Sequence, residues 1–289
     1  MAEGRIMTSI GGFYDVEDET GRYQCRARGR FRKDNVKPIV GDWVSFSKDG
    51  AYITEVHERD NMLLRPPVAN VDQAYIICAA KDPDFSSYFL DRVLVHAEAE
   101  DIEPVIVITK LDQVSDDDLE LLNVYKRLYE DVGYDVYFTR LLEEGPPPAL
   151  TAELDQRITV LSGPSGAGKS TLLNVLAPEA QVETGEVSAQ LGRGRHTTRH
   201  VELWNVNGGR IADTPGFSSL EFHGIEAKDL TLYFPEMRER LPDCKFRGCA
   251  HKNEPGCAVK AAVSEGEVAE ERYQHYLSFY DEIQSRRLY

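Results

Sequence analysis

The order of two short motifs is the feature that most constrains how this chain can fold. The segment GPSGAGKS, residues 163–170, matches the phosphate-loop pattern G-x-x-x-x-G-K-[ST] at every fixed position. The segment TKLD, residues 109–112, has the form of a base-recognition loop, yet it lies upstream of the phosphate loop. In an ordinary guanine-nucleotide-binding domain the phosphate loop comes first. Either one motif is accidental, or the domain has been cut and rejoined.

The phosphate loop stands in the context that its chemistry requires. The apolar run RITVLS precedes it and TLLNVLA follows it, so a strand leads into the loop and a helix leads out. Glycines let backbone N–H groups close around a β-phosphate, the lysine reaches the β and γ oxygens, and the serine hydroxyl ligates Mg²⁺. The predicted nucleotide-binding residues are Gly163, Pro164, Ser165, Gly166, Ala167, Gly168, Lys169, Ser170 and Thr171, and Lys169 is also a catalytic candidate.

A second metal-site element follows the phosphate loop. The segment DTPG, residues 213–216, comes at the end of an apolar strand. There Asp213 is predicted to hold Mg²⁺, and the Gly216 N–H to sense a γ-phosphate. By itself D-x-x-G is an ordinary turn, but downstream of a complete phosphate loop it indicates a nucleotide site.

The segment GRGRHTTRH, residues 192–200, lies between these two motifs and is predicted to act as a switch loop. Thr198, favoured over Thr197, is a catalytic candidate that can complete a Mg²⁺ shell only when a γ-phosphate is present. Phe217 occupies the place where many nucleotide hydrolases have a glutamine that orients the attacking water. His196 is therefore the catalytic candidate for orienting that water. The alternative is a basic surface loop with an exposed histidine that takes no part in catalysis.

The TKLD loop follows the apolar strand PVIVI, where a ligand-facing loop of an α/β sheet belongs. The Asp112 carboxylate can accept two hydrogen bonds from guanine, which adenine cannot donate, and the Lys110 stem can cover the base. Thr109 stands where asparagine is usual, and the missing amide is expected to weaken the network around the loop. The segment FTR, residues 138–140, matches a base-supporting Ser-Ala pair only weakly.

The hydrophobic pattern divides the chain into three domains. Residues 1–67 contain short strand-like runs broken by turns, which predicts an oligonucleotide-binding type of β-barrel. Residues 68–222 alternate apolar strands with amphipathic helices, which predicts a mostly parallel sheet. If the original ends of this domain are joined through GPPPALTAEL, residues 145–154, the motif order is that of a circular permutation. Residues 223–289 form a small α-rich domain that ends in an amphipathic helix over 264–287.

The C-terminal domain contains a group of metal-ligand residues. Cys244, Cys249, His251 and Cys257 follow one another at short spacings among glycines and a proline. Three thiolates and one imidazole suit a closed, tetrahedral, structural Zn²⁺ site. The alternative is a small core of reduced cysteines. Cys25 and Cys78 each lie alone in a strand-like run and are expected to be core residues.

The charge of the chain limits its partners. A formal net charge of -16 argues against attraction of nucleic acid to the whole surface. One local stretch contains many basic residues and a single acid, Asp34. Its basic residues are Arg22, Arg26, Arg28, Arg30, Arg32, Lys33 and Lys37. This stretch is either a solvated strand and loop or an RNA-binding face, with Tyr23 or Phe31 free to stack on bases. No apolar run is long enough to cross a bilayer, so we expect a cytoplasmic protein.

The permuted order of phosphate loop, HTTR, DTPG and TKLD, with a barrel before them and C-x₄-C-x-H-x₅-C after them, resembles the RsgA family over essentially the whole chain. The resemblance implies a bacterial GTPase that depends on the small ribosomal subunit. Such a protein assists late maturation of the subunit, binds ribosomal RNA through the barrel and zinc domains, and leaves after GTP hydrolysis. The implied cofactors are GTP or GDP, Mg²⁺ and one structural Zn²⁺. We expect a monomer with no membrane partner.

Two other functional classes remain to be distinguished. One is a nucleic-acid-binding scaffold whose nucleotide is structural and is not hydrolysed. Its weakness is that a scaffold does not need a complete set of Mg²⁺ ligands. The other is a phosphate-loop kinase of a small molecule, which TKLD and the lack of an acceptor-site motif disfavour.

Overall fold

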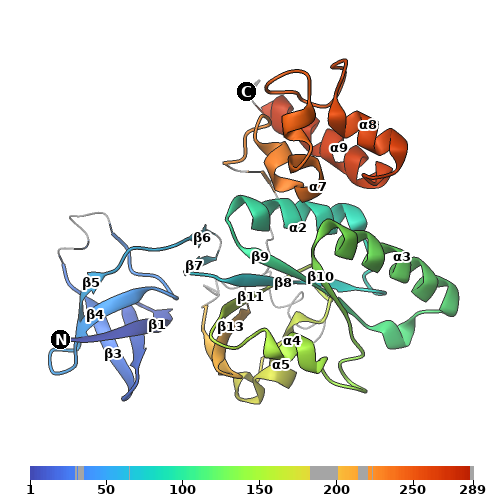
Figure 1. Cartoon of the computed structure of the whole chain (residues 1–289). Coiled ribbons are helices and arrows are strands. Elements are labelled where there is room, and N and C mark those ends of the chain that lie inside the picture. Colours follow the sequence, from blue (N-terminus) through green and yellow to red (C-terminus); the bar gives the residue numbers. More distant parts are fainter. Residues whose placement is uncertain are drawn as a thin grey trace.

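Five short strands at the N-terminus close into a barrel (Figure 1). Alternation of buried and exposed residues along β4, with Val44 and Phe46 inside, gives the barrel its core. The strand order is β1-β2-β3-β5-β4, and β1 pairs with β4 to close it. This confirms the predicted barrel. The strands are β1 (Ala2–Ile10), β2 (Phe13–Asp18), β3 (Gly21–Ala27), β4 (Trp43–Ser47) and β5 (Tyr52–Val56).

This computed structural model describes residues 1–29, 31, 36–64, 66–182, 201–213, 221–222 and 224–286. Within these ranges no helix is both long and apolar enough to span a membrane. A two-stranded ribbon, β6 (Met62–Leu64) and β7 (Pro67–Ala69), leads from the barrel to the central sheet.

The central sheet has the strand order β10-β9-β8-β11-β13-β12. Every neighbouring pair is parallel except the hairpin of β12 and β13. All residues of β8 and β11 are buried, as expected for central strands that are covered on both faces. The strands are β8 (Gln73–Ala79), β9 (Glu103–Thr109), β10 (Asp135–Phe138), β11 (Ile158–Ser162), β12 (Trp204–Val206) and β13 (Gly209–Asp213).

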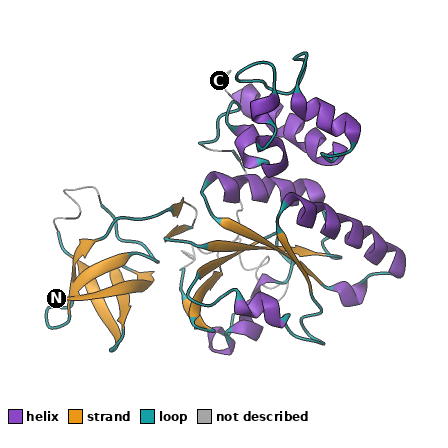
Figure 2. Ribbon diagram, in the orientation of Figure 1, coloured by secondary structure: helices purple, strands orange, loops and turns teal. Residues whose placement is uncertain are grey.

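Helices cover both faces of this sheet (Figure 2). The side chains of β8 alternate between the two layers, with Ile76 packed among residues of α2 and α3, and Tyr75 among residues of α4 and α5. The helices are α2 (Ser87–Ala99) and α3 (Asp116–Val132) on one face, and α4 (Pro148–Ala152) and α5 (Lys169–Leu176) on the other. Short 3₁₀ turns lie at η1 (Leu111–Gln113) and η2 (Pro178–Ala180).

The sheet order explains why the motifs occur in reversed sequence. The strand that leads into the phosphate loop, β11, pairs with β8 on one side and with β13 on the other. The strands β8, β9 and β10 precede it in the chain, and the chain returns to the sheet centre through α4. The ends of β9 and β11 therefore lie at the same edge of a parallel sheet, next to the point where the strand order reverses. This arrangement confirms the predicted permutation.

The C-terminal part is helical and packs against α2 (Figure 1). Its elements are η4 (Leu230–Tyr233), α7 (Pro235–Arg238), η5 (Leu241–Asp243), α8 (Ala258–Glu265) and α9 (Glu270–Arg286). The prediction of one helix over 264–287 was wrong at its start. Ser264 and Glu265 end α8, because Gly266 takes a left-handed conformation (φ 78°) that caps that helix. The last helix begins at Glu270.

The barrel is joined to the central sheet by more than its connecting ribbon. Met7 lies at a bulge of β1, and its carbonyl accepts a hydrogen bond from the Leu203 N–H at 2.9 Å. Thr8 pairs with Glu202 as an isolated antiparallel bridge. Met7 and Leu203 also share one hydrophobic cluster with Ile158. The barrel therefore packs beside the β12 and β13 hairpin of the central sheet.

Candidate nucleotide-binding site and metal centre

The phosphate loop connects the buried strand β11 to helix α5, as predicted. Gly163 has φ +143°, and a Cβ atom there would lie 2.1 Å from the Ile77 carbonyl oxygen, so no larger residue fits. Gly168 has φ +101° and precedes the first turn of α5. The N-terminal end of α5 thus follows a glycine loop, the arrangement in which free backbone N–H groups bind phosphate.

The ammonium group of Lys169 lies within the loop. Its Nζ donates to the carbonyl oxygens of Gly163 and Pro164, both at 2.8 Å. Ser165 and Gly166 are exposed to solvent, whereas Ala167 is buried. Ser170 and Thr171, in the first turn of α5, are partly exposed. The loop therefore holds a positive charge close to backbone groups that face solvent.

The base-recognition loop begins where β9 ends. Lys110 has a left-handed conformation (φ 59°) and donates from Nζ to the Asp82 carbonyl oxygen. The turn η1 follows, with Leu111 buried and Asp112 exposed. The exposed Asp112 carboxylate is thus accessible to a ligand.

Thr109 connects the two loops directly. Its hydroxyl donates to the Ala167 carbonyl oxygen at 2.6 Å, and the residue is 1% exposed. The sequence suggested that the missing amide would weaken the network at this position. The hydroxyl supplies one buried hydrogen bond to the phosphate loop, 58 residues away in the sequence, and the strength of the whole network stays a prediction.

The FTR segment lies beside the same loop. The Thr139 N–H donates to the Ile108 carbonyl oxygen at 2.9 Å, next to Thr109. Thr139 is buried, and its hydroxyl has no hydrogen-bond partner among the described residues. This segment therefore packs behind the base-recognition loop, and none of its contacts among the described residues indicates that it binds the base.

The remaining nucleotide-site candidates are described only in part. The Asp213 backbone pairs with Leu161 at the end of β13, next to the phosphate loop. The Asp213 side chain, and all of Gly216, His196 and Thr198, lie outside the described residues.

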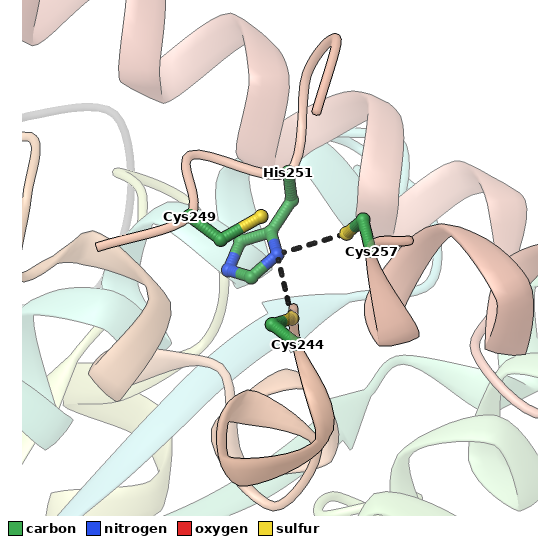
Figure 3. A group of neighbouring side chains, drawn as sticks. All are labelled: Cys244, Cys249, His251 and Cys257. Atoms are coloured by element: carbon green, nitrogen blue, oxygen red, sulfur yellow. Dashed lines mark hydrogen bonds between the residues drawn. The ribbon is translucent and has the colours of Figure 1, made fainter. Parts of the chain in front are cut away.

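The four predicted zinc ligands come together in the C-terminal part (Figure 3). Their ligand atoms all lie within 4.8 Å of one another. The His251 Nδ1 faces two sulfur atoms, those of Cys244 at 3.8 Å and Cys257 at 3.2 Å. Ligands of one tetrahedral Zn²⁺ are about 3.6 to 3.8 Å apart, given metal–ligand distances of about 2.0 to 2.3 Å. The donor set Cys244, Cys249, His251 and Cys257 therefore fits one closed zinc site.

Neighbouring residues hold the ligand loop in shape. The Tyr273 hydroxyl donates to the His251 carbonyl at 2.6 Å, and the Tyr276 hydroxyl to the Ala250 carbonyl at 3.1 Å. The Glu254 carboxylate accepts hydrogen bonds from the Ala250, Lys252 and Asn253 N–H groups, which lowers its pKa. Burial lowers the pKa of His251, which favours the neutral imidazole that a metal requires. Sequence analysis missed these supports because only the four ligands follow a recognisable spacing.

The structure describes only part of the basic stretch of the barrel, and one residue within that stretch, Phe31, is placed differently from the prediction. Arg30, Arg32 and Lys33 lie outside the described residues. Arg22 is paired with Glu17 at 2.8 Å, and Glu17 also accepts a hydrogen bond at 3.0 Å from Asn205 in β12 of the central sheet. Phe31 is only 6% exposed and packs in the barrel core, so the prediction that it is free to stack on bases was wrong.

Other aromatic side chains are exposed on the barrel. Trp43 and Phe13 are exposed, and each lies under an arginine, Arg5 at 4.7 Å and Arg26 at 4.5 Å. Arg28 lies over the Tyr52 ring at 4.0 Å. Arginines and aromatic rings on the surface of a barrel are the residue types that bind single-stranded nucleic acid. Cys25 and Cys78 are buried and unpaired, as predicted.

Comparison with known proteins identifies relatives of the whole chain. Residues 56–223 match the model of the RsgA GTPase family, and residues 3–53 match that of the RsgA N-terminal domain. A protein of Halalkalibacterium halodurans named small ribosomal subunit biogenesis GTPase RsgA is 50% identical over 289 residues, covering 99% of this chain and 98% of that protein. A Bacillus pumilus protein of the same name is 50% identical over 295 residues, with 99% of both chains covered.

Two solved structures have the same architecture. One is described as the crystal structure of YloQ, a circularly permuted GTPase; it has a TM-score of 0.84 and 43% identity, and the match covers 99% of this chain and 96% of that chain. The other is YjeQ from Thermotoga maritima, with a TM-score of 0.87, 36% identity and 98% of each chain covered.

Proposed function

The chain belongs to the RsgA GTPase family, and on this basis we propose that it binds the small ribosomal subunit and assists its late maturation, hydrolysing GTP with stimulation by the subunit. The relatives' name, small ribosomal subunit biogenesis GTPase, supports the subunit as partner. The structural observation that carries the proposal is the hydrogen bond from Thr109 to Ala167. It joins a base-recognition loop to a phosphate loop within a permuted sheet.

The described residues support specific roles toward GTP. The N–H groups of the loop from Gly163 to Gly168 and the first turn of α5 would bind the phosphates. The Lys169 ammonium, which now contacts two loop carbonyls, would instead pair with phosphate oxygens. Asp112 would accept the guanine N1–H and N2–H hydrogen bonds, which favours GTP over ATP. Lys110 would cover the base.

Mg²⁺ is implied by the family, and the donor types suit it. A hydroxyl from Ser170, a hydroxyl from Thr198 and the carboxylate of Asp213 are hard oxygen ligands, and Mg²⁺ is usually bound by few protein oxygens together with substrate phosphates. When bound, the ion neutralises charge on the β- and γ-phosphates. Gly216 would sense the γ-phosphate through its N–H.

Hydrolysis by the chain alone should be slow, because Phe217 cannot orient water. We assign that role to His196 in the switch loop. His196→Ala should retain GTP and subunit binding and lose most subunit-stimulated turnover, by roughly ten- to thousand-fold. If this variant kept the stimulated turnover of the wild type, the ribosome or the backbone would orient the attacking water. His196 would then be an exposed loop residue that takes no part in catalysis.

The flanking domains would supply the RNA contacts. The cations and rings of the barrel, with Arg26, Arg28 and Trp43 on its surface, would bind ribosomal RNA. One structural Zn²⁺ would hold the C-terminal ligand loop for the same partner. We propose domain limits of 1–67, 68–222 and 223–289, a monomer, and a cytoplasmic location that follows from the partner.

Co-sedimentation with purified small ribosomal subunits tests the proposed partner. The chain should pellet with subunits in the presence of a non-hydrolysable GTP analogue and be released with GDP. A nucleic-acid-binding scaffold would bind equally with either nucleotide. A small-molecule kinase would not bind subunits at all.

A further inference from the structure

Helix α9 of the C-terminal part contacts α2 of the nucleotide domain mainly along the first half of α2. Tyr88 and Ser278 share a hydrogen bond between their hydroxyls at 3.1 Å. Arg92 donates to both carboxylate oxygens of Glu282 at 2.6 Å. The Ser87 hydroxyl, in the first turn of α2, donates to Glu271. These contacts hold the N-terminal half of α2 at several points.

Asp91 is the centre of this interface. It is 0% exposed, and its carboxylate accepts hydrogen bonds from the Tyr129 hydroxyl at 3.0 Å and from Arg272, and contacts His275 Nδ1 at 2.6 Å. Arg272 is 2% exposed and also donates to Glu236 at 2.6 and 3.1 Å. Charged groups of α2 and of the C-terminal part are thus buried together, and most of their hydrogen-bond donors and acceptors have partners.

Such a network is a poor means of gaining stability. Apolar residues of similar volume often stabilise a protein as well as a buried ion pair does, because desolvation offsets the Coulomb attraction. A charge network differs from an apolar contact in being directional, since a planar guanidinium bonds its carboxylates in few orientations. The network therefore fixes how α9 is placed on α2.

The segment before α2 reaches the nucleotide loops. The Asp82 carbonyl accepts the hydrogen bond from Lys110 of the base-recognition loop. Pro83 lies against the phosphate loop, since a Cβ atom at Gly166 would be 3.5 Å from the Pro83 Cδ. Ser86 then caps α2 by accepting the Phe89 N–H at 3.2 Å. The position of α2 therefore determines where one end of this short segment lies, and the segment contacts both the base-recognition loop and the phosphate loop.

We propose that α9 positions residues 81–86 beside the nucleotide site, with Asp91 as the positioning residue of the nucleotide domain. This inference rests on the proposed guanine-nucleotide site. The C-terminal part then has a second role, because it supports nucleotide affinity in addition to contacting a partner. Any partner that displaces α9 would then change the affinity of the chain for the nucleotide.

The test is GDP affinity, measured with a fluorescent GDP on the full chain that retains its zinc. Asp91→Asn keeps the shape of the side chain and removes its charge. It should weaken GDP binding by roughly three- to thirty-fold, the usual size of such indirect coupling, and raise the KM for GTP more than it lowers kcat. Arg272→Lys should give a similar loss, because a cation remains but the planar group that bonds Asp91 and Glu236 together is gone. Glu271→Gln, at an exposed edge of the same interface, gives a milder variant if Asp91→Asn does not fold.

Glu98→Gln is the matched control. Glu98 lies on the same helix and contacts Arg238 of the C-terminal part at 3.2 Å and Tyr134 at 3.1 Å, but it is about 10 Å further from the nucleotide loops. This variant should lower the melting temperature and leave GDP affinity unchanged. Wild-type affinity in Asp91→Asn and Glu271→Gln, or an equal loss in Glu98→Gln, would overturn the inference and leave the proposed function intact. Absence of GDP binding by the wild type would overturn both.

Discussion

The hydrogen bond between Thr109 and Ala167 makes a quantitative prediction possible. Thr109→Val keeps the branched shape of the side chain and removes the hydroxyl. The Ala167 carbonyl would lose a 2.6 Å partner at a site where Thr109 is 1% exposed, so water cannot easily replace it. Leaving a buried acceptor unsatisfied costs about 1–3 kcal/mol. If only the nucleotide-bound loop bears that cost, because the free loop can rearrange and satisfy the carbonyl, affinity for GTP and GDP falls by roughly five- to 150-fold.

The assay is titration of the protein with fluorescent GDP and GTP analogues well below its melting temperature. Thr109→Ser is the matched control, because it restores the hydroxyl and should recover most of the affinity. The loss in Thr109→Val should be the same for GDP in the wild-type background and for xanthosine diphosphate in an Asp112→Asn background, since Thr109 acts on the phosphate loop. An affinity within twofold of wild type in Thr109→Val would refute this reasoning.

Three further predictions concern the base, the metal and the RNA. Asp112→Asn should weaken GTP and improve xanthosine triphosphate, because an amide can donate to the xanthine 2-oxo group; unchanged base preference in competition binding would remove Asp112 as the reader. Elemental analysis should find one Zn²⁺ per chain after dialysis, and Cys249→Ser should unfold the C-terminal part more than the nucleotide domain, since structural zinc supplies folding free energy; freshly purified protein without zinc would contradict this. Replacing Arg28, Arg30 and Arg32 together should weaken subunit binding and flatten its salt dependence, with nucleotide affinity unchanged; an unaltered salt slope would mark the stretch as a solvated face.

Features set by local spacing were predictable from the sequence. The phosphate loop between a strand and a helix and the grouping of the four zinc ligands each depend on residues close together in the chain, so both could be predicted before the fold was known. The permuted sheet was also predictable, because the hydrophobic pattern fixed where strands fall relative to those motifs.

Features that depend on distant residues were not predictable. Asp91 and Arg272 are 181 positions apart, and in the sequence each looks like an ordinary surface charge of an amphipathic helix. Phe31 lies among arginines in the sequence, which suggested an exposed ring, but its side chain is buried in the barrel core. Tertiary packing decided both cases, and no local signal carried that information.

Hydrolysis of GTP and ATP, with and without purified small ribosomal subunits, tests the central claim most directly. The base-recognition loop predicts turnover of GTP and not of ATP. The lack of a glutamine after DTPG predicts slow turnover by the chain alone and strong stimulation by subunits. Equal turnover of both nucleotides, or GTP turnover that subunits do not change, would contradict the account.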